Sequence, residues 1–231
     1  MLGVLGGMGP LATVDFMKKL VAETRVATDQ CHIPTVVWSV PQVADRSQYI
    51  MQQGESPYPG LLNGVFKLKS LGAIVIAIPC NTAHYWADEL MQHSGIMILH
   101  IADAVMNQIK RRLPQGGKVG LLATTGTLRA QIYQNRVLLD ADKWQLVLPD
   151  DYNQSLLMQG IREAKSGKVD SARNIFQQQV KVLKAAGAEL VILGCTELPS
   201  VLDQDPYLID SNLALARRCT EWHRANYAGV V

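Results

Sequence analysis

The sequence lacks the signals of several large classes of protein. No apolar run approaches the ~20 residues that a membrane-spanning helix needs. The formal charge of +2 is too small to indicate a nucleic-acid partner. The basic residues are scattered, apart from the short run at 110–112, which ends an expected helix, where cations are favourable. We therefore expect neither a membrane nor a nucleic acid as a partner.

Cysteine is scarce and is not spaced as in metal sites. The chain has four cysteines in 231 residues, with no Cys-x-x-Cys and no His-x-x-x-His, so no structural zinc or other metal is expected. The N-terminus is apolar but has no basic leader and meets Gly and Pro within ten residues, unlike a secretory signal. We expect free thiols in the reducing cytoplasm.

Apolar residues are abundant in the sequence. Apolar residues make up 48% and charged residues 18% of the chain, a composition typical of a globular protein with a sizeable core. The length allows one large domain or two small ones.

One stretch combines a buried strand with a cysteine. The run 73–78 predicts a strand buried on both faces, and Pro79 ends it. Cys80 then stands at the turn into an expected helix, with Asn81 or Thr82 as its N-cap. Unpaired backbone N–H groups and the helix dipole would favour thiolate at this cysteine.

The same arrangement occurs a second time. An apolar strand at 190–194 leads into Cys195 and Thr196, and a Gly-Ala pair precedes each strand, at 72–73 and at 187–188. The two cysteines and the two Gly-Ala pairs are each 115 residues apart. Two like-placed thiols in one cleft suit a reaction in which one proton leaves a carbon and another arrives on the opposite face.

The rest of the chain follows the same duplicated order. We expect strands at 2–5, 35–40, 96–100, 144–148 and 207–210 and another from Val119, and helices at 11–26, 60–71, from Cys80 to about 92, 102–113, 171–186 and up to about 226. Alternating strands and helices predict parallel sheets covered on both faces. The predicted fold is therefore α/β: two pseudo-symmetric doubly wound domains with parallel four-stranded sheets and the active site in the cleft between them. We assign 1–101 plus 211–231 to the first domain and 102–210 to the second.

Ligands of such sheets bind beyond the carboxyl ends of the strands. The loops expected there are 6–10, 41–46, 80–82, 123–127, 149–152 and 195–197. The glycines of loop 6–10 do not match Gly-x-Gly-x-x-Gly, so we favour backbone binding of a small carboxylate over nucleotide binding.

Several residues allow two interpretations. A single cysteine after a buried strand is usually just a small apolar residue, but two equivalent ones indicate function; Cys31 and Cys219 lack this setting and are interpreted as structural. His84 could pair with the Cys80 thiol or pack under its loop. Glu197 could orient Thr196 or cap its own helix, and we favour capping. Arg46 could bind a ligand or lie on a solvated face.

Together the motifs resemble the aspartate/glutamate racemase family. They are Gly-Gly-Met-Gly-Pro at 6–10, Cys-Asn-Thr-Ala-His at 80–84, Ala-Thr-Thr-Gly-Thr at 123–127 and Gly-Cys-Thr-Glu at 194–197, and the resemblance covers essentially the whole chain. It implies a cofactor-independent amino-acid racemase, usually a homodimer, with Cys80 and Cys195 as the acid/base pair. It implies that Asn81, Thr82 and the loop of Thr124, Gly126 and Thr127 hold the α-carboxylate and ammonium, and that Arg46 and Lys165 bind the distal carboxylate. Met8, Gly9, Gln42 and Thr196 complete the expected substrate contacts.

Three functions remain to be compared. The first is racemisation of aspartate or glutamate, with one cysteine as thiolate, the other as thiol, and the carbanion stabilised by Asn81, Thr82 and Thr127; one thiol must then have a pKa below the free value of about 8.5. The second is a same-scaffold isomerase such as a maleate isomerase, a hydantoin racemase or a malonate decarboxylase, in which one cysteine performs the main step. The third is a binding protein that kept the cleft.

Overall fold

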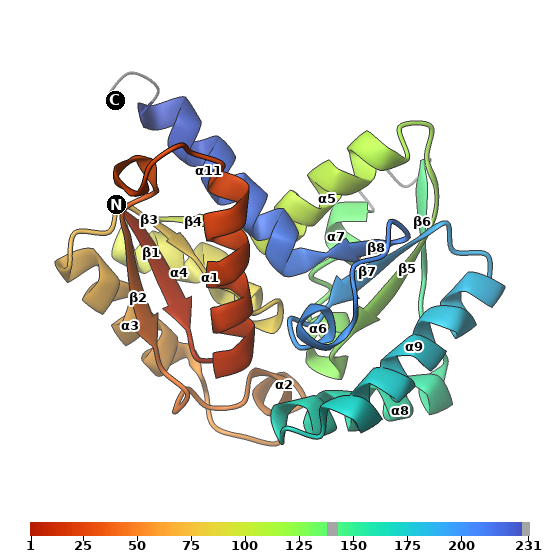
Figure 1. Cartoon of the computed structure of the whole chain (residues 1–231). Helices are drawn as coiled ribbons and strands as arrows, with labels where there is room; N and C mark the ends of the chain where they lie inside the picture. The colour runs from red at the N-terminus through yellow and green to blue at the C-terminus, as the bar shows by residue number, and fades with distance from the viewer. Residues whose placement is uncertain (138–142, 228–231) are drawn as a thin grey trace.

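The computed structural model describes residues 1–137 and 143–227, and these form two units that each contain a parallel four-stranded sheet (Figure 1). The first sheet has the order β2-β1-β3-β4, with β1 Leu2–Gly6, β2 Thr35–Ser39, β3 Val75–Ala77 and β4 Met97–Leu99. The second has the order β6-β5-β7-β8, with β5 Gly117–Ala123, β6 Trp144–Val147, β7 Leu190–Gly194 and β8 Leu208–Asp210. The order of the second sheet repeats that of the first, and the predicted fold class is confirmed.

Helices cover the sheets in the alternating order that the sequence predicts. They are α1 Pro10–Thr24, α2 Arg46–Ile50, α3 Tyr58–Ser70, α4 Ala87–Ser94, α5 Ile101–Arg112, α6 Thr125–Arg129, α7 Gln134–Val137, α8 Asp151–Lys165, α9 Val169–Ala185, α10 Leu198–Val201 and α11 Ser211–Tyr227, with short 3₁₀ helices η1 Asp29–Cys31 and η2 Thr82–Trp86. The sequence analysis did not predict α2 or α8. It was also wrong to expect one helix from Cys80 to about residue 92, because η2 comes first and α4 begins only at Ala87.

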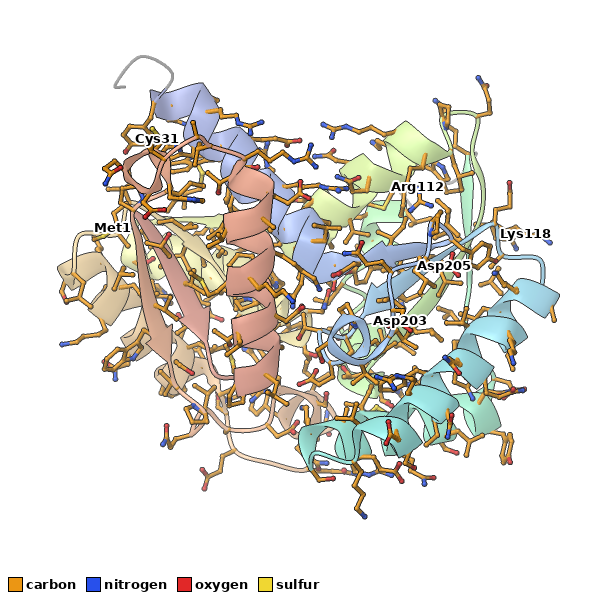
Figure 2. All side chains as sticks on the ribbon, in the orientation of Figure 1. Met1, Cys31, Arg112, Lys118, Asp203 and Asp205 are labelled. Carbon is orange, nitrogen blue, oxygen red and sulfur yellow. The ribbon has the colours of Figure 1, made fainter. Side chains whose placement is uncertain are left out.

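The central strands are buried because helices lie on both faces of each sheet. Every residue of β1, β3 and β7 is buried, which explains why these strands are continuous apolar runs rather than alternating ones. Cys219 lies in the core of the first unit with Phe16 and Leu215, whereas Cys31 lies in η1 at the edge of that unit (Figure 2). Both cysteines lie in helices, Cys31 in η1 and Cys219 in α11, and not in a loop after a strand as Cys80 and Cys195 do.

Two helices cross from one unit to the other. Helix α5 follows β4 of the first sheet, yet its residues Val105 and Ile109 pack with Val119 of the second sheet. Helix α11 follows β8 of the second sheet, yet Leu215 packs with the first sheet, and Figure 1 shows it lying beside α1. The division into 1–101 plus 211–231 and 102–210 stays a proposal; 138–142 and 228–231 lie outside the described residues.

Candidate active site

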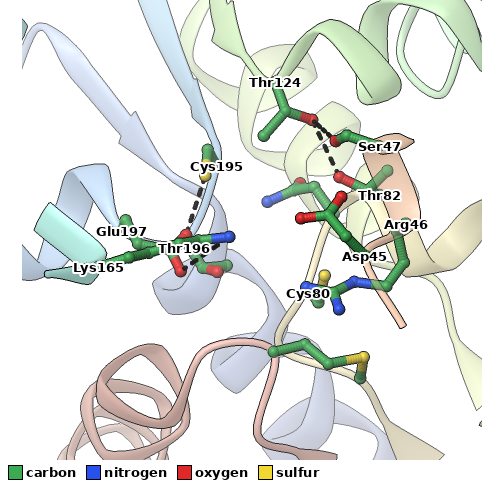
Figure 3. Close-up of a pocket in the computed structure, with 12 residues that line it drawn as sticks. Asp45, Arg46, Ser47, Cys80, Thr82, Thr124, Lys165, Cys195, Thr196 and Glu197 are labelled. Atoms are coloured by element: carbon green, nitrogen blue, oxygen red, sulfur yellow. Dashed lines mark hydrogen bonds and ion pairs between the residues drawn. The ribbon is translucent and has the colours of Figure 1, made fainter. Parts of the chain in front are cut away.

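A small cavity lies at the carboxyl ends of the strands, and both units contribute to its wall (Figure 3). Its volume is about 20 Å³, room for about one water molecule. Twelve residues line it: Met8, Asp45, Arg46, Ser47, Cys80, Asn81, Thr82, Thr124, Lys165, Cys195, Thr196 and Glu197. The two cysteines of the duplicated motif thus share one cavity, and Figure 3 shows them on different sides of it.

Cys80 stands where the chain leaves the first sheet. Its backbone N–H donates to the carbonyl of Ile78 at 2.8 Å, and its side chain is 5% exposed. Asn81 stands at the N-cap position, as one of the two predicted alternatives, but its side chain makes no capping hydrogen bond and the element that follows is the five-residue 3₁₀ helix η2. The expected effect of the following helix on the Cys80 thiol stays a prediction.

Cys195 has a carboxylate as its neighbour. Its Sγ donates to Glu197 Oε2 at 2.9 Å, and both side chains are buried. Burial raises the pKa of the Cys195 thiol well above its usual range, and the negative charge of Glu197 raises it further, against a smaller opposing effect of Lys165. Cys195 is therefore not the thiol whose pKa is lowered, and its environment favours the protonated form.

Glu197 does not have the role that the sequence analysis favoured. It precedes α10, but its side chain makes no capping hydrogen bond. Its Oε1 lies 3.9 Å from Lys165 Nζ and has no hydrogen-bond partner among the described residues. A Cβ added to Gly9 would come within 3.2 Å of this oxygen, so a glycine at that position leaves space for the carboxylate.

Two cations border the cavity. Arg46 is 8% exposed, which rules out the solvated face; its Nη1 donates to the carbonyls of Val43 and Ala44 at 3.1 and 3.0 Å, and within the described chain its buried Nε has no partner. Burial alone lowers the pKa of Lys165, but Glu197, Cys195 and Cys80 outweigh it, so the pKa is raised and Lys165 stays charged. Both cations can therefore attract an anionic ligand.

Hydroxyl groups from the two units meet beside the cavity. Thr82 Oγ1 lies 3.0 Å from Thr124 Oγ1 and 2.9 Å from Thr127 Oγ1, and Thr124 Oγ1 donates to Thr127 Oγ1 at 3.0 Å. Ser47 Oγ, from α2, donates to Thr124 Oγ1 at 3.3 Å. These hydroxyls donate to one another. A bound carboxylate could become their acceptor instead.

His84 packs under the first cysteine rather than pairing with its sulfur. Its Nδ1 lies 2.9 Å from the Cys80 carbonyl oxygen, and because a carbonyl only accepts, Nδ1 carries the proton. Burial lowers the pKa of His84 to about 4, although its contact with the Cys80 carbonyl opposes this. A neutral His84 therefore holds the backbone at Cys80.

Not every residue expected in the site lines the cavity. Nine of the thirteen do: Met8, Arg46, Cys80, Asn81, Thr82, Thr124, Lys165, Cys195 and Thr196. Gly9 lines an adjoining groove, Thr127 lies in the hydroxyl group, and Gly126 packs so closely on Ser47 that a Cβ would lie 2.6 Å from its Oγ. Gln42 is exposed and lines neither space, so its role stays a prediction.

Several residues of the site were not predicted from the sequence. Asp45 and Ser47 also line the cavity. They flank Arg46 in the sequence, and this position beside a predicted substrate-binding residue could have drawn attention to them. Tyr133 and Ser211 hydrogen-bond to Asn81. Nothing in the local sequence around either residue indicates this contact.

A larger groove adjoins the cavity. It has a volume of about 680 Å³ and shares Met8, Asp45, Arg46, Lys165 and Glu197 with the cavity. The two cations thus lie between the groove and the thiols. A ligand larger than water needs movement of these shared side chains or of the two units to reach the cysteines.

The described residues contain neither a cluster of metal ligands nor a membrane-spanning helix. Across 1–137 and 143–227, no group of three or more His, Cys, Asp or Glu side chains is arranged to hold a metal ion. In the same residues, no helix has the length and apolar character required to cross a membrane.

Known proteins resemble this chain along nearly all of its length. The sequence model of the Asp/Glu/Hydantoin racemase family matches residues 5–219. The broad-specificity amino-acid racemase RacX of Bacillus subtilis is 28% identical over 226 residues, which cover 94% of this chain and 95% of RacX. The structure of the Picrophilus torridus aspartate racemase aligns with a TM-score of 0.82 at 30% identity. The alignment covers 95% of this chain and 94% of the Picrophilus chain. An aspartate racemase homologue from Pyrococcus horikoshii has a TM-score of 0.72 at 27% identity, with 96% and 97% covered.

Proposed function

The chain belongs to the Asp/Glu/Hydantoin racemase family and is an amino-acid racemase, and we propose that it racemises aspartate or glutamate without a cofactor, with Cys80 and Cys195 as the two proton-transfer groups. The observation that carries the proposal is that both like-placed cysteines line one cavity together with the buried Arg46. One cysteine would remove the α-proton and the other would protonate the opposite face.

The surroundings of the cysteines suggest how their roles divide. Burial and Glu197 favour the thiol at Cys195, which donates to that carboxylate. Lys165 interacts with both cysteines, and a two-cysteine mechanism needs one thiolate beside one thiol. We therefore assign the thiolate of the resting enzyme to Cys80 and the thiol to Cys195, and the roles exchange when the opposite enantiomer is the substrate.

The rest of the cavity wall fits an acidic amino acid. The hydroxyl group of Thr82, Thr124 and Thr127, together with Asn81, offers donors to the α-carboxylate, which gains charge as the α-proton leaves. Arg46, whose buried Nε has no partner within 1–137 and 143–227, and Lys165 offer charge to the distal carboxylate. A single-cysteine reaction on the same scaffold would not need the second thiol in this cavity.

The test is proton exchange in deuterated water. Wild-type protein incubated with L- or D-aspartate or glutamate should put deuterium at Cα and form the other enantiomer. Replacement of either Cys80 or Cys195 by Ser should lower racemisation by about 100-fold or more, since each removes one acid/base group. Cys31→Ser is the matched control, because Cys31 lies in η1 outside the site, and it should keep wild-type rates.

Two results would overturn the proposal. Absence of exchange with both acidic amino acids would reject the substrate class. Survival of most turnover in Cys195→Ser would reject the two-cysteine mechanism and favour a single-cysteine reaction. A homodimer, implied by the family resemblance, and a cytoplasmic location, expected from the free thiols, are the remaining parts of the proposal.

A further inference from the structure

Hydrogen bonds connect the two cysteine-bearing segments, which we call the first cysteine loop (79–82) and the second cysteine loop (193–197). One bond is direct: Thr196 Oγ1 donates to the carbonyl of Pro79 at 3.3 Å. It joins the residue after Cys195 to the residue before Cys80. The strands that carry the loops belong to different sheets, so these bonds run between the two units.

A second connection passes through residues outside both loops. Tyr133 Oη donates to Asn81 Oδ1 at 2.5 Å, Asn81 Nδ2 donates to Ser211 Oγ at 3.1 Å, and Ser211 Oγ donates to the carbonyl of Leu193 at 2.7 Å. Tyr133 and Ser211 are fully buried, and Asn81 is 2% exposed. Tyr133 comes from the turn between α6 and α7, and Ser211 is the first residue of the crossing helix α11.

The direction of each bond in this chain is determined. A carbonyl oxygen only accepts, so the Ser211 hydroxyl donates to Leu193 and its oxygen is left to accept from Asn81. Burial raises the pKa of Tyr133, so its hydroxyl keeps its proton and donates to the oxygen of the Asn81 amide. The amide thus has one orientation, with its oxygen toward Tyr133.

That orientation matters because Asn81 also lines the cavity. An amide NH₂ has two N–H groups, and the bond to Ser211 uses one of them. The second remains for an acceptor such as a carboxylate. A rotated amide would present its oxygen instead, which repels a carboxylate.

We propose that Tyr133 and Ser211 are positioning residues that hold the two cysteine loops at their separation and orient the Asn81 amide as a donor toward the substrate carboxylate. This inference rests on the proposed racemase function for its kinetic consequence. The connection between the loops does not depend on the identity of the substrate.

The experiment compares Tyr133→Phe, Ser211→Ala and Ser211→Thr with two matched controls. Tyr207→Phe and Ser94→Ala each remove a hydroxyl that donates to a backbone carbonyl, of Ala188 and Leu90 respectively, away from the cavity. For each variant, kcat and KM for aspartate and glutamate, the melting temperature, and amide hydrogen exchange in peptides covering 78–86 and 191–198 are measured.

The expected results separate positioning from mere stabilisation. Tyr133→Phe and Ser211→Ala should each lower kcat by about tenfold, the factor that one hydrogen bond typically contributes, whereas Ser211→Thr should largely restore it. Amide exchange should rise in both loops in both variants, although Tyr133 contacts only the first loop. In the combined variant, kcat should fall by less than the product of the two single effects, because both residues act in one chain of hydrogen bonds. The controls should keep wild-type kcat and loop exchange even where their melting temperatures fall.

The inference is overturned if Tyr133→Phe and Ser211→Ala lower the melting temperature like the controls but leave kcat and loop exchange unchanged. It is also overturned if Tyr133→Phe affects exchange only in residues 78–86. If the wild-type protein turns over no acidic amino acid, the proposed function fails, while the exchange measurement still tests the connection between the loops.

Discussion

At the scale of single residues, the Cys195–Glu197 pair distinguishes the two halves of the site. A buried thiol beside a carboxylate keeps its proton, because ionisation would place two negative charges close together. The corresponding position after Cys80 is occupied by Thr82, whose hydroxyl contacts other threonines instead. Similar backbones therefore carry cysteines with different electrostatic surroundings.

Replacement of Glu197 by Gln should lower the pKa of Cys195. The carboxylate raises this pKa in the native protein, whereas an amide of similar shape removes the negative charge and leaves the effects of burial and of Lys165. The pH at which Cys195 reacts half-maximally with iodoacetamide, measured by peptide mass spectrometry, should therefore decrease. Glu221→Gln, a surface change near Arg111, is the control. An unchanged or higher midpoint in Glu197→Gln would contradict this account.

At the scale of elements, two histidines lie where the first sheet passes into helices. His84 is in η2, and His100 is the N-cap of α5, where its Nδ1 accepts from the Ala102 N–H at 3.2 Å. Their ring centroids are 4.6 Å apart. Burial lowers both pKa values; Arg136 lowers them further, and Asp103 opposes this at His84. Both elements are therefore built around neutral imidazoles.

This arrangement predicts a loss of stability in acid. The unfolded chain takes up a proton on His84 near pH 6.5, while the folded chain does so only near pH 4. The stability contributed by neutral His84 is thus complete above pH 6.5. Below that pH it falls by about 1.4 kcal/mol per pH unit, so that the total loss is about 3 kcal/mol at pH 4.

Urea unfolding between pH 6.5 and 5 checks the prediction, because most carboxylates remain ionised there. His84→Asn should show a flatter dependence of the unfolding free energy on pH than the wild-type protein. His32→Asn, at a partly exposed position after η1, should keep the wild-type slope. Equal slopes for wild type and His84→Asn would show that His84 is not the group responsible.

At the scale of the whole molecule, α1 and the start of α11 join the units around Lys19. Its Nζ lies 2.5 Å from Asp15 and 2.6 Å from Asp210 at the end of β8, and all three side chains are less than one fifth exposed. Asn212 Nδ2 adds a bond of 2.8 Å to Asp15. These contacts tie α1 of the first unit to the end of β8 in the second.

Lys19→Met should destabilise the protein by about 3–5 kcal/mol at pH 7, since it leaves two largely buried carboxylates without their cation. Burial already raises the pKa of Asp210, and loss of Lys19 would raise it further. A group with a raised pKa binds its proton more tightly when folded, so the deficit should shrink as the pH falls. Urea unfolding at pH 7 and pH 5 measures both effects, and adding Asp210→Asn should recover part of the loss. A deficit that does not depend on pH would contradict the electrostatic explanation.

The sequence by itself determined the alternation of strands and helices, the duplication, and the two cysteines at equivalent strand ends. These features are local: apolar β-branched runs, turn residues and spacing are visible along the chain, and parallel strands bring their carboxyl ends to one edge. The family resemblance added the expected substrate contacts, and nine of the thirteen expected site residues line one cavity.

Only the tertiary structure decided how the polar groups around the cysteines are used. Asn81 and Glu197 look like helix caps in the sequence, but Asn81 bonds to Tyr133 and Ser211, and Glu197 accepts from Cys195. Which partner a side chain contacts depends on the packing of two units and of the helix that crosses between them, and no local pattern encodes those distances. For that reason the fold and the family could be predicted from the sequence, whereas the hydrogen bonds around the two cysteines could not.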